Sequence, residues 1–478
     1  MLFNSFEFMV FFPIVVFLYF FCPQKYRWAL LLGASYYFYM AWRPEYIVLI
    51  LASTIIDYTL SLKMGAEKKK KNRKKYLYLS LVSNLGLLFI FKYFGFFNDS
   101  LVAVSSFFGG NYKGISLELL LPMGISFYTF QTLSYTIDVY NGKIKPEKHL
   151  GIFALYVSFF PQLVAGPIER SNRLLPQFYK KHEFEYDRVS DGLKRMAIGF
   201  FKKVVIADRV AIAVNTVYNN PREYQGVVLI VATILFAIQI YCDFSGYSDI
   251  AIGAAKVMGF DLMENFKRPY FSRSIGEFWS RWHISLSSWF RDYVYIPLGG
   301  NRVKMSKMHI NIIITFLISG LWHGANWTFV AWGGIHGIYL VVEKMVGVRV
   351  PKSRVRYILH VITTFALVCV AWVFFRANTF SDAIYIVTHL GFDPREILNM
   401  HQIKADLLNI GLDKIQWIIS FFSIVMMFII QYLEERESII DRIRRKPVLF
   451  RWSLYYVLIM AIIFLAITNN QEFIYFQF

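Results

Sequence analysis

The sequence predicts an all-α, polytopic membrane protein, and three observations support this class. Of its 478 residues, 56% are hydrophobic, and the mean hydropathy is +0.43, which is unusual for a soluble domain. Apolar runs long enough to cross a bilayer recur along the whole chain. Lysine and arginine gather in the short segments between these runs, as the positive-inside rule describes. The runs lack the apolar–polar alternation of barrel strands, so helices are the expected way to satisfy the backbone in lipid.

The composition also excludes other classes of protein. A net charge of +19 would suit a nucleic-acid-binding protein, but its placement in short loops indicates membrane orientation, and no nucleic-acid partner is expected. The three cysteines lie within apolar segments at spacings that fit neither a disulfide framework nor a metal site. The first apolar run, residues 6–21, lacks a basic leader and a cleavage site, so it is expected to remain as a helix.

The first half of the chain is expected to cross the membrane repeatedly. The lysine-rich loop 63–75 marks the cytoplasmic side, and three crossings before it place the N-terminus outside. Residues 98–116 form an expected outer loop, and residues 150–166, with basic flanks on both sides, predict a re-entrant segment. The spans expected here are 6–21, 28–42, 46–62, 76–97 and 117–137.

The second half adds further spans and brings the expected total to about eleven, with the C-terminus also outside. Residues 264–309 have basic flanks and predict a re-entrant or interfacial helix, and residues 376–414 predict an amphipathic outer segment. We expect a single domain over 1–478, with core motifs in 117–346 and C-terminal helices and an outer tail in 358–478. The spans expected here are 196–218, 227–258, a hairpin at 309–346, 358–375, 415–433 and 452–468.

His323 lies at the predicted turn of that hairpin, in the stretch SGLWHGANWTFVAWGGIHG (319–337). An ionisable side chain at membrane depth is costly, so it is a functional-site hypothesis by default. Gly320 and Gly324 would let backbone or substrate approach closely there. The alternative is a structural histidine bonded to a neighbouring carbonyl group, and it stays open for His283 and His336 as well.

His283 lies forty residues before His323, in a segment rich in tryptophan and arginine. Ser274 and Glu277 match a capping box, which predicts one helix that continues through His283. Tryptophan and arginine are common membrane-interface anchors, whereas a histidine in such a band is not. The polar and aromatic residues of this predicted helix are Trp279, Arg281, Trp282, His283, Trp289 and Arg291.

Two acids, Asp243 and Asp249, lie in the apolar segment 227–258. One interpretation is that they pair with arginines or backbone amides inside the helix bundle. The other is an ion relay, which would suit a non-enzymatic transporter or channel. No inverted repeat of the kind found in transporters is visible in the sequence.

Five motifs resemble the membrane-bound O-acyltransferase family, in the bacterial branch that modifies alginate, peptidoglycan and teichoic acids. They run in order through most of the chain. The resemblance implies a ring of helices around a central funnel, with an acyl donor entering from the cytoplasm and an acceptor from the other face. The motifs are SFYTFQTLSYTIDVY (126–140), FFPQLVAGPIER (159–170), IYCDFSGYSDIAIG (240–253), FWSRWHISLSSWFRDYVYIPLGGNR (278–302) and LWHGANWTFVAWGGIHG (321–337).

The resemblance also implies roles for particular residues. His323 corresponds to the family's catalytic histidine, and His283 to a second site residue. The tail FIYFQF (473–478) resembles the C-terminal motif of a small partner peptide in the D-alanyl transfer system, so Tyr475 is a candidate acyl relay. The alternative is an aromatic tail that packs on the outer surface. The candidate donor-binding residues are Arg281, Arg291, Trp282 and Trp322.

The implied reaction passes an acetyl group from acetyl-CoA, a donor substrate rather than a bound cofactor, to a hydroxyl group of a polysaccharide outside the membrane. No metal is expected. The implied location is the bacterial plasma membrane, and the implied partner is an extracytoplasmic acyltransferase. Chain length and the additional C-terminal helices favour acetyl transfer, while D-alanyl transfer from a carrier protein stays open. The sequence does not identify the glycan.

Overall fold

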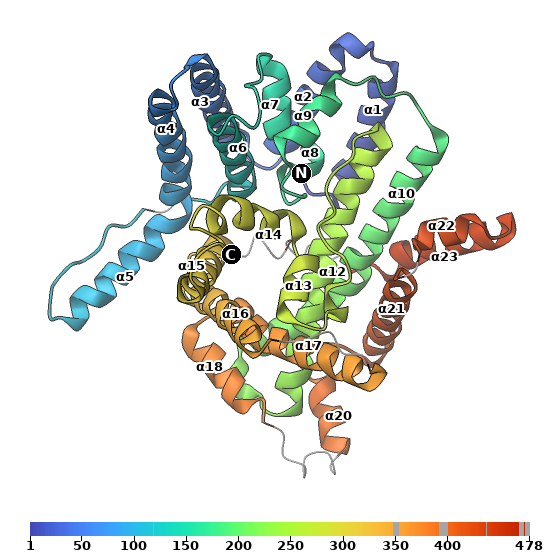
Figure 1. Cartoon of the computed structure of the whole chain (residues 1–478). Coiled ribbons are helices and arrows are strands. Elements are labelled where there is room, and N and C mark those ends of the chain that lie inside the picture. Colours follow the sequence, from blue (N-terminus) through green and yellow to red (C-terminus); the bar gives the residue numbers. More distant parts are fainter. Residues whose placement is uncertain (118, 348–352, 392–399, 436, 468–472, 474–478) are drawn as a thin grey trace. The chain divides into compact units, whose positions relative to one another are not determined.

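The computed structural model describes the chain except residues 118, 348–352, 392–399, 436, 468–472 and 474–478. All regular elements in the described ranges are helices (Figure 1). The chain divides into two compact units, Met1–Leu193 with Ala251–Met263 and Lys194–Ile250 with Glu264–Phe478. Because α10 and α12 contain the division points, each contributes residues to both units.

The first unit is formed mainly by the N-terminal helices. Their bounds are α1 Phe6–Phe21, α2 Gln24–Met40, α3 Ile47–Ala66, α4 Lys70–Leu88, α5 Phe94–Phe107, α6 Ile125–Tyr140, α7 Leu150–Ser158, α8 Phe160–Leu163, α9 Ser171–Tyr179 and the first half of α10 Tyr186–Phe200.

The second unit contains most of the later helices and carries the predicted chemistry. Their bounds are α11 Asp208–Asn219, α12 Val227–Met258, α13 Ile275–Arg281, α14 Ile284–Phe290, α15 Met305–His323, α16 Trp327–Val346, α17 Arg354–Arg376, α18 Phe380–His389, α20 Met400–Leu408, α21 Lys414–Leu433, α22 Ile439–Arg444 and α23 Val448–Leu465. A π-helical turn, η3 Phe201–Ala207, joins α10 to α11, and another, η6 Arg291–Tyr295, follows α14.

Eight segments of the described chain are long and apolar enough to span a bilayer, and α1 is a shorter apolar helix. The all-α, multi-pass class is therefore confirmed. Four expected spans are not among the eight. The spans 6–21, 28–42 and 117–137 correspond to α1, α2 and α6, which have only 16, 17 and 16 residues, and 196–218 falls across α10, η3 and α11. The eight segments are Pro44–Ala66, Lys70–Phe107, Val227–Met258, Met305–His323, Trp327–Val346, Arg354–Arg376, Lys414–Leu433 and Val448–Leu465.

Two expectations about the first unit need correction. The segment expected as an outer loop from residue 98 begins inside a helix, since α5 continues the helix of α4 to Phe107. The expected span 117–137 becomes helical only at Ile125, where Gly124 adopts φ +71° just before the first turn. Glycine tolerates this left-handed conformation at little cost, so Gly124 sets the start of the helix.

The hairpin of α15 and α16 is confirmed, and Figure 1 shows the two helices side by side in yellow and orange. A Cβ atom at Gly320 would collide with the carbonyl oxygen of Phe329, so the two backbones touch at this level. Small residues allow this close approach between helices in membranes. Asn326 caps α16 by accepting a hydrogen bond from the Thr328 amide, and His323 is the last residue of α15.

The single helix expected through His283 is wrong, because the chain breaks between α13 and α14. Ser274 does cap α13 by accepting from the Glu277 amide, but the Glu277 carboxylate accepts from the amide of Arg273 instead of completing the capping box. His283 has φ +43°, a left-handed conformation that is rare for residues other than glycine. Such conformations cost about 1–3 kcal/mol and cluster at functional sites.

Candidate functional site

His283 and His323, forty residues apart in sequence, lie next to each other in the second unit. Their ring centres are 6.4 Å apart, with the planes inclined at 66°. His283 is fully buried and His323 is 3% exposed. The ring of Trp322 contacts both, with centre distances of 4.9 Å to His323 and 6.1 Å to His283. The structure thus brings three of the predicted site residues together.

Aromatic side chains enclose His323. The ring centres of Trp332 and Phe375 lie 5.0 Å and 5.4 Å from the imidazole, both in edge-to-face orientation. Trp332 comes from α16 and Phe375 from α17, so three spanning helices meet at this histidine. Such an enclosure keeps bulk water away and strengthens any electrostatic interaction within it.

Asn265 orients His283, and the sequence analysis did not find it. The Asn265 side-chain oxygen lies 3.1 Å from Nδ1 of His283. The ring of Phe244 covers the imidazole edge-to-face at 4.6 Å. Burial lowers the pKa of His283 to about 3, so the ring is neutral near pH 7. Asn265 belongs to a loop eighteen residues upstream, where no periodicity or motif spacing signals the contact.

His336 is held as a structural histidine in an aromatic cluster. It is fully buried, and the indole N–H of Trp279 donates to its Nδ1 at 3.2 Å. The ring stacks on Phe278 with an interplanar angle of 4° and meets Trp332 edge-to-face. The structural interpretation that the sequence left open for His336 is therefore favoured.

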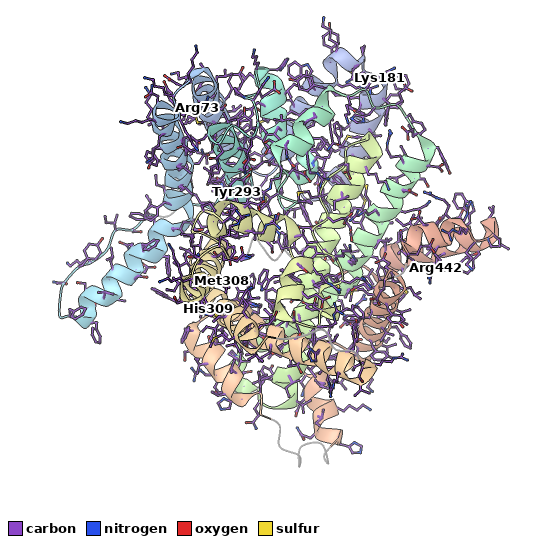
Figure 2. The ribbon with its side chains drawn as sticks, viewed as in Figure 1. Arg73, Lys181, Tyr293, Met308, His309 and Arg442 are labelled. Carbon is purple, nitrogen blue, oxygen red and sulfur yellow. The ribbon has the colours of Figure 1, made fainter. Side chains whose placement is uncertain are left out.

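His309 belongs to the same helix as His323 but lies far from it. Figure 2 labels His309 with Met308 in α15, whose first residue is Met305 and whose last is His323. Fourteen residues of α-helix separate the two histidines, which corresponds to about 21 Å at 1.5 Å per residue. Position along α15 therefore excludes His309 from the site of His323.

The two candidate donor-binding arginines pair with carboxylates of their own segments. Arg281 Nη2 lies 2.6 Å from Glu277 Oε1, one turn earlier in α13. Arg291 Nε lies 2.9 Å from Asp292 Oδ1, and its side chain is 64% exposed. Trp282 is buried and stacks on Phe278, so it belongs to the hydrophobic core of the second unit.

The acids of α12 are paired with lysine and arginine, which agrees with the structural interpretation of these residues. Asp249 lies 2.7 Å from Lys202 and 3.0 Å from Arg195. Asp243 lies 2.8 Å from Lys203, and both side chains of this pair are almost fully buried. Arg195 comes from α10, and Lys202 and Lys203 come from the π-helical turn η3 that follows it.

One described residue of the C-terminal tail, Phe473, packs against aromatic side chains of α12. Phe473 is 2% exposed, and its ring centre lies 4.8 Å from Tyr247 and 6.0 Å from Phe244. Phe244 is the side chain that covers His283. Tyr475 lies outside the described residues.

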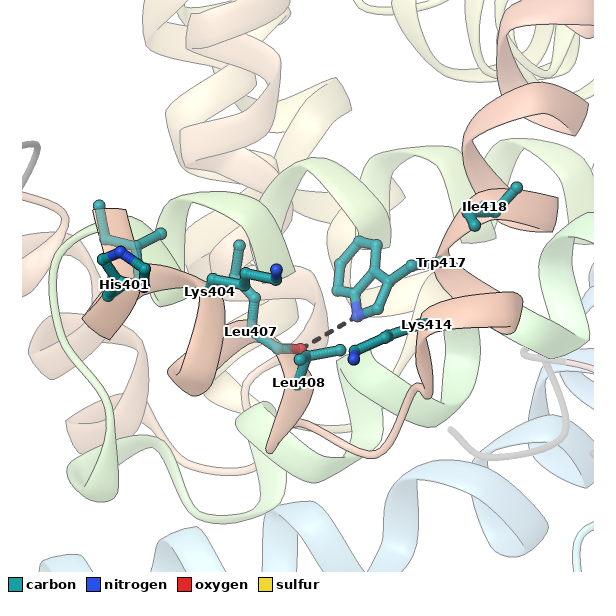
Figure 3. Close-up of a pocket in the computed structure, with 8 residues that line it drawn as sticks. His401, Lys404, Leu407, Leu408, Lys414, Trp417 and Ile418 are labelled. Atoms are coloured by element: carbon teal, nitrogen blue, oxygen red, sulfur yellow. Dashed lines mark hydrogen bonds between the residues drawn. The ribbon is translucent and has the colours of Figure 1, made fainter. Parts of the chain in front are cut away.

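A surface pocket of ≈590 Å³ lies between α20 and the start of α21 (Figure 3). Leu407, Lys414 and Trp417 are among its lining residues, and the Trp417 indole N–H donates to the Leu407 carbonyl at 3.0 Å. Among the described residues, no predicted site residue lines this pocket. The candidate site rests on the buried histidine pair.

The spanning helices and the paired imidazoles define a multi-pass membrane protein with a candidate acid–base site. The chain belongs to the membrane-bound O-acyltransferase family, because the sequence model of that family matches residues 37–381. This range contains both histidines, and it ends before the C-terminal tail. Family membership makes the chain an O-acyltransferase and sets aside the transporter alternative.

Three relatives show the range of the similarity. A "probable alginate O-acetylase" of Pseudomonas putida is 43% identical over 79% of this chain and 78% of its own length. A peptidoglycan O-acetyltransferase of Helicobacter pylori is 33% identical over 100% of this chain and 98% of its own length. A teichoic acid D-alanyltransferase of Bacillus subtilis is 30% identical over 55% of this chain and 70% of its own length.

Proposed function

We propose that the protein moves an acetyl group from acetyl-CoA on the cytoplasmic side to a hydroxyl group of a polysaccharide outside the membrane. The observation that carries the proposal is the buried pair of imidazoles at 6.4 Å. The names of the alginate and peptidoglycan relatives support the acetyl group and the polysaccharide acceptor. Coenzyme A stays inside the cell while the glycan lies outside, so the acyl group alone has to pass.

In this mechanism His323 is the general base. A hydroxyl group is a weak nucleophile, and it becomes reactive when an imidazole takes its proton. The hydroxyl oxygen attacks the thioester carbonyl carbon, the C–S bond breaks, and the imidazolium returns the proton to the leaving sulfur. The products are an ester and a free thiol. A positioned base of this kind contributes about 10²–10⁴-fold to the rate.

His283 is the second site residue, and either orients the donor or polarises the thioester carbonyl. The two rings lie too far apart for a direct hydrogen bond, which suits two groups that contact the same substrate from different sides. Trp322 contacts both rings and would line the site, and Trp282 directly precedes His283 in the chain. Arg291, with its exposed side chain, and Arg281 would bind the anionic phosphates of the donor by exchanging their carboxylate partners.

Tyr475 is the proposed relay between the two faces. Its phenol oxygen would take the acetyl group from the thioester, and the phenyl ester would then pass it to an extracytoplasmic partner acyltransferase. Support comes from Phe473, two residues earlier, which is buried against Phe244, the side chain that covers His283. A radioactive acetyl donor should label Tyr475. Absence of this ester, with full activity of Tyr475→Phe, would eliminate the relay.

The proposed location is the bacterial plasma membrane, with both termini outside and loop 63–75 in the cytoplasm. Reporter fusions that are active only in the periplasm should work at the termini and fail in this loop. The opposite pattern would reverse the direction of transfer.

D-alanyl transfer from a carrier protein is the second candidate, and the teichoic acid relative is the observation that favours it. Purified protein in detergent should be offered acetyl-CoA and a D-alanyl carrier protein in parallel. Acetyl-CoA turnover that depends on an added acceptor supports the first function. Turnover of the D-alanyl donor alone would replace it with the second.

A further inference from the structure

We infer that Asn265 is a positioning residue that fixes His283 in one tautomer, with the hydrogen on Nδ1 and the hydrogen-bond-accepting lone pair on Nε2. The inference rests on the proposed function, since it assigns a chemical role to a residue of that site. It goes further by choosing between the two roles open to His283. The orientation of the Asn265 amide determines the imidazole tautomer, and the surrounding backbone holds both residues.

The orientation of the Asn265 amide follows from its partners. The Ser285 backbone N–H points at the side-chain oxygen at 3.4 Å, and the Ser285 hydroxyl donates to the same atom at 2.9 Å. A backbone N–H can only donate, so the atom facing it has to be the amide oxygen and not the nitrogen. The amide nitrogen donates on its other side to the Ser248 hydroxyl at 3.2 Å.

The imidazole tautomer follows from the amide. His283 Nδ1 lies 3.1 Å from the oxygen so identified, and an amide oxygen can only accept. Nδ1 therefore carries the hydrogen. In a neutral imidazole the other nitrogen, Nε2, then has the lone pair. Burial keeps the ring neutral near pH 7, since it lowers the pKa of His283 to about 3.

The backbone around His283 reinforces this arrangement. The Ile284 N–H donates to the backbone oxygen of Asn265 at 2.9 Å, and the Lys267 N–H donates to that of Arg281 at 2.9 Å. His283 itself adopts φ +43°, which its neighbours have to impose. Asn265 thus holds His283 through both its main chain and its side chain.

The tautomer decides what His283 can do. A lone pair on Nε2 can accept a hydrogen bond or a proton from an O–H or amide N–H group of a bound substrate. It has no hydrogen to give to a thioester carbonyl, so neutral His283 does not polarise that group through Nε2. Of the two roles, the geometry therefore selects orientation of the substrate, with Nε2 of His283 accepting a hydrogen bond from it.

The test compares Asn265→Ala and Asn265→Asp with matched variants of Asn311. Asn311 is also a buried asparagine of the second unit, but its amide donates to the backbone oxygens of Leu298 and Gly300 rather than contacting a histidine. Asn265→Ala should lower kcat by about 10²-fold. Asn265→Asp should keep the acceptor and rescue activity at alkaline pH.

The pH profile separates positioning from simple structural support. A carboxylate at position 265 stabilises the imidazolium and raises the pKa of His283. The activity of Asn265→Asp should therefore fall at a higher pH than that of the wild type as the solution is acidified. Asn311→Asp should leave the profile unshifted. An unshifted profile in folded Asn265→Asp would overturn the inference.

A second measurement needs no folded Asn265 variant. Nitrogen-15 NMR of histidine-labelled protein, with His283→Gln to assign the signal, should show the hydrogen on Nδ1 of His283. A hydrogen on Nε2 would overturn the inference. The proposed function fails differently: His323→Ala and His283→Gln would both retain activity, whatever the tautomer.

Discussion

His283 and His336 are both fully buried and surrounded by aromatic rings, and each is hydrogen-bonded to a polar side chain, but these partners differ in polarity. Asn265 presents an oxygen to His283, whereas Trp279 presents an N–H to His336. The oxygen of Asn265 accepts from Nδ1 of His283, so the lone pair of that ring is on Nε2. The N–H of Trp279 donates to Nδ1 of His336, so the lone pair of that ring is on Nδ1. Burial is therefore the same for the two histidines, and the polarity of the partner is the difference on which the proposed roles rest.

The largest expected effect belongs to His323→Ala. Removal of the general base should lower acceptor-dependent acetyl transfer by about 10²–10⁴-fold. The measurement is the initial rate of acetyl-CoA consumption by purified protein, with folded protein quantified by size-exclusion chromatography. Wild-type rates in this variant would remove His323 from the mechanism.

A smaller loss of activity is expected for His283→Gln. Glutamine preserves a polar group but not the acceptor nitrogen in its place, so kcat should fall by about 10²-fold. His336→Gln is the matched control, and its kcat should change less than threefold once folded protein is equalised. Equal losses of kcat in the two variants would abolish the distinction between the two histidines.

The comparison also predicts how stability depends on pH. An unperturbed histidine has a pKa near 6.5, whereas that of His283 is lowered to about 3 by burial. Below pH 6.5 the unfolded chain binds a proton that the folded chain refuses, so the free energy of unfolding falls by up to about 1.4 kcal/mol per pH unit. The melting temperature should drop between pH 7 and pH 5, and His283→Gln should drop less. Identical slopes in the two proteins would contradict this account.

The smallest effect is expected for Trp279→Phe. The change removes the indole donor from His336 while it keeps an aromatic ring, and a buried acceptor left unsatisfied costs about 1–3 kcal/mol. The melting temperature should fall, whereas kcat per folded molecule should stay within threefold of the wild type. A large loss of kcat without a loss of stability would place His336 in the chemistry.

The sequence predicted the features that depend on local pattern. The hairpin of α15 and α16 followed from two apolar runs around LWHGAN, and His323 was expected at its turn. Pairing with arginine was one of the two interpretations left open for Asp249, and the structure places Arg195 and Lys202 beside it.

Features that depend on distant contacts escaped prediction. At the break between α13 and α14, Ile284 donates a backbone hydrogen bond to Asn265, and Lys267 donates one to Arg281. The capping box and the aromatic pattern of the segment did not reveal these contacts. Asn265 escaped for the same reason. The apolar run 150–166 contains two short helices, α7 and α8. The sequence did not show this division, because hydropathy indicates burial and not helix length.

The most direct test of the central claim is the acceptor-dependent turnover of acetyl-CoA by three purified proteins: the wild type, His323→Ala and His336→Gln. The account predicts turnover by the wild type and by His336→Gln at similar rates, and a loss of at least about 10²-fold in His323→Ala. Equal turnover by His323→Ala and the wild type would contradict it.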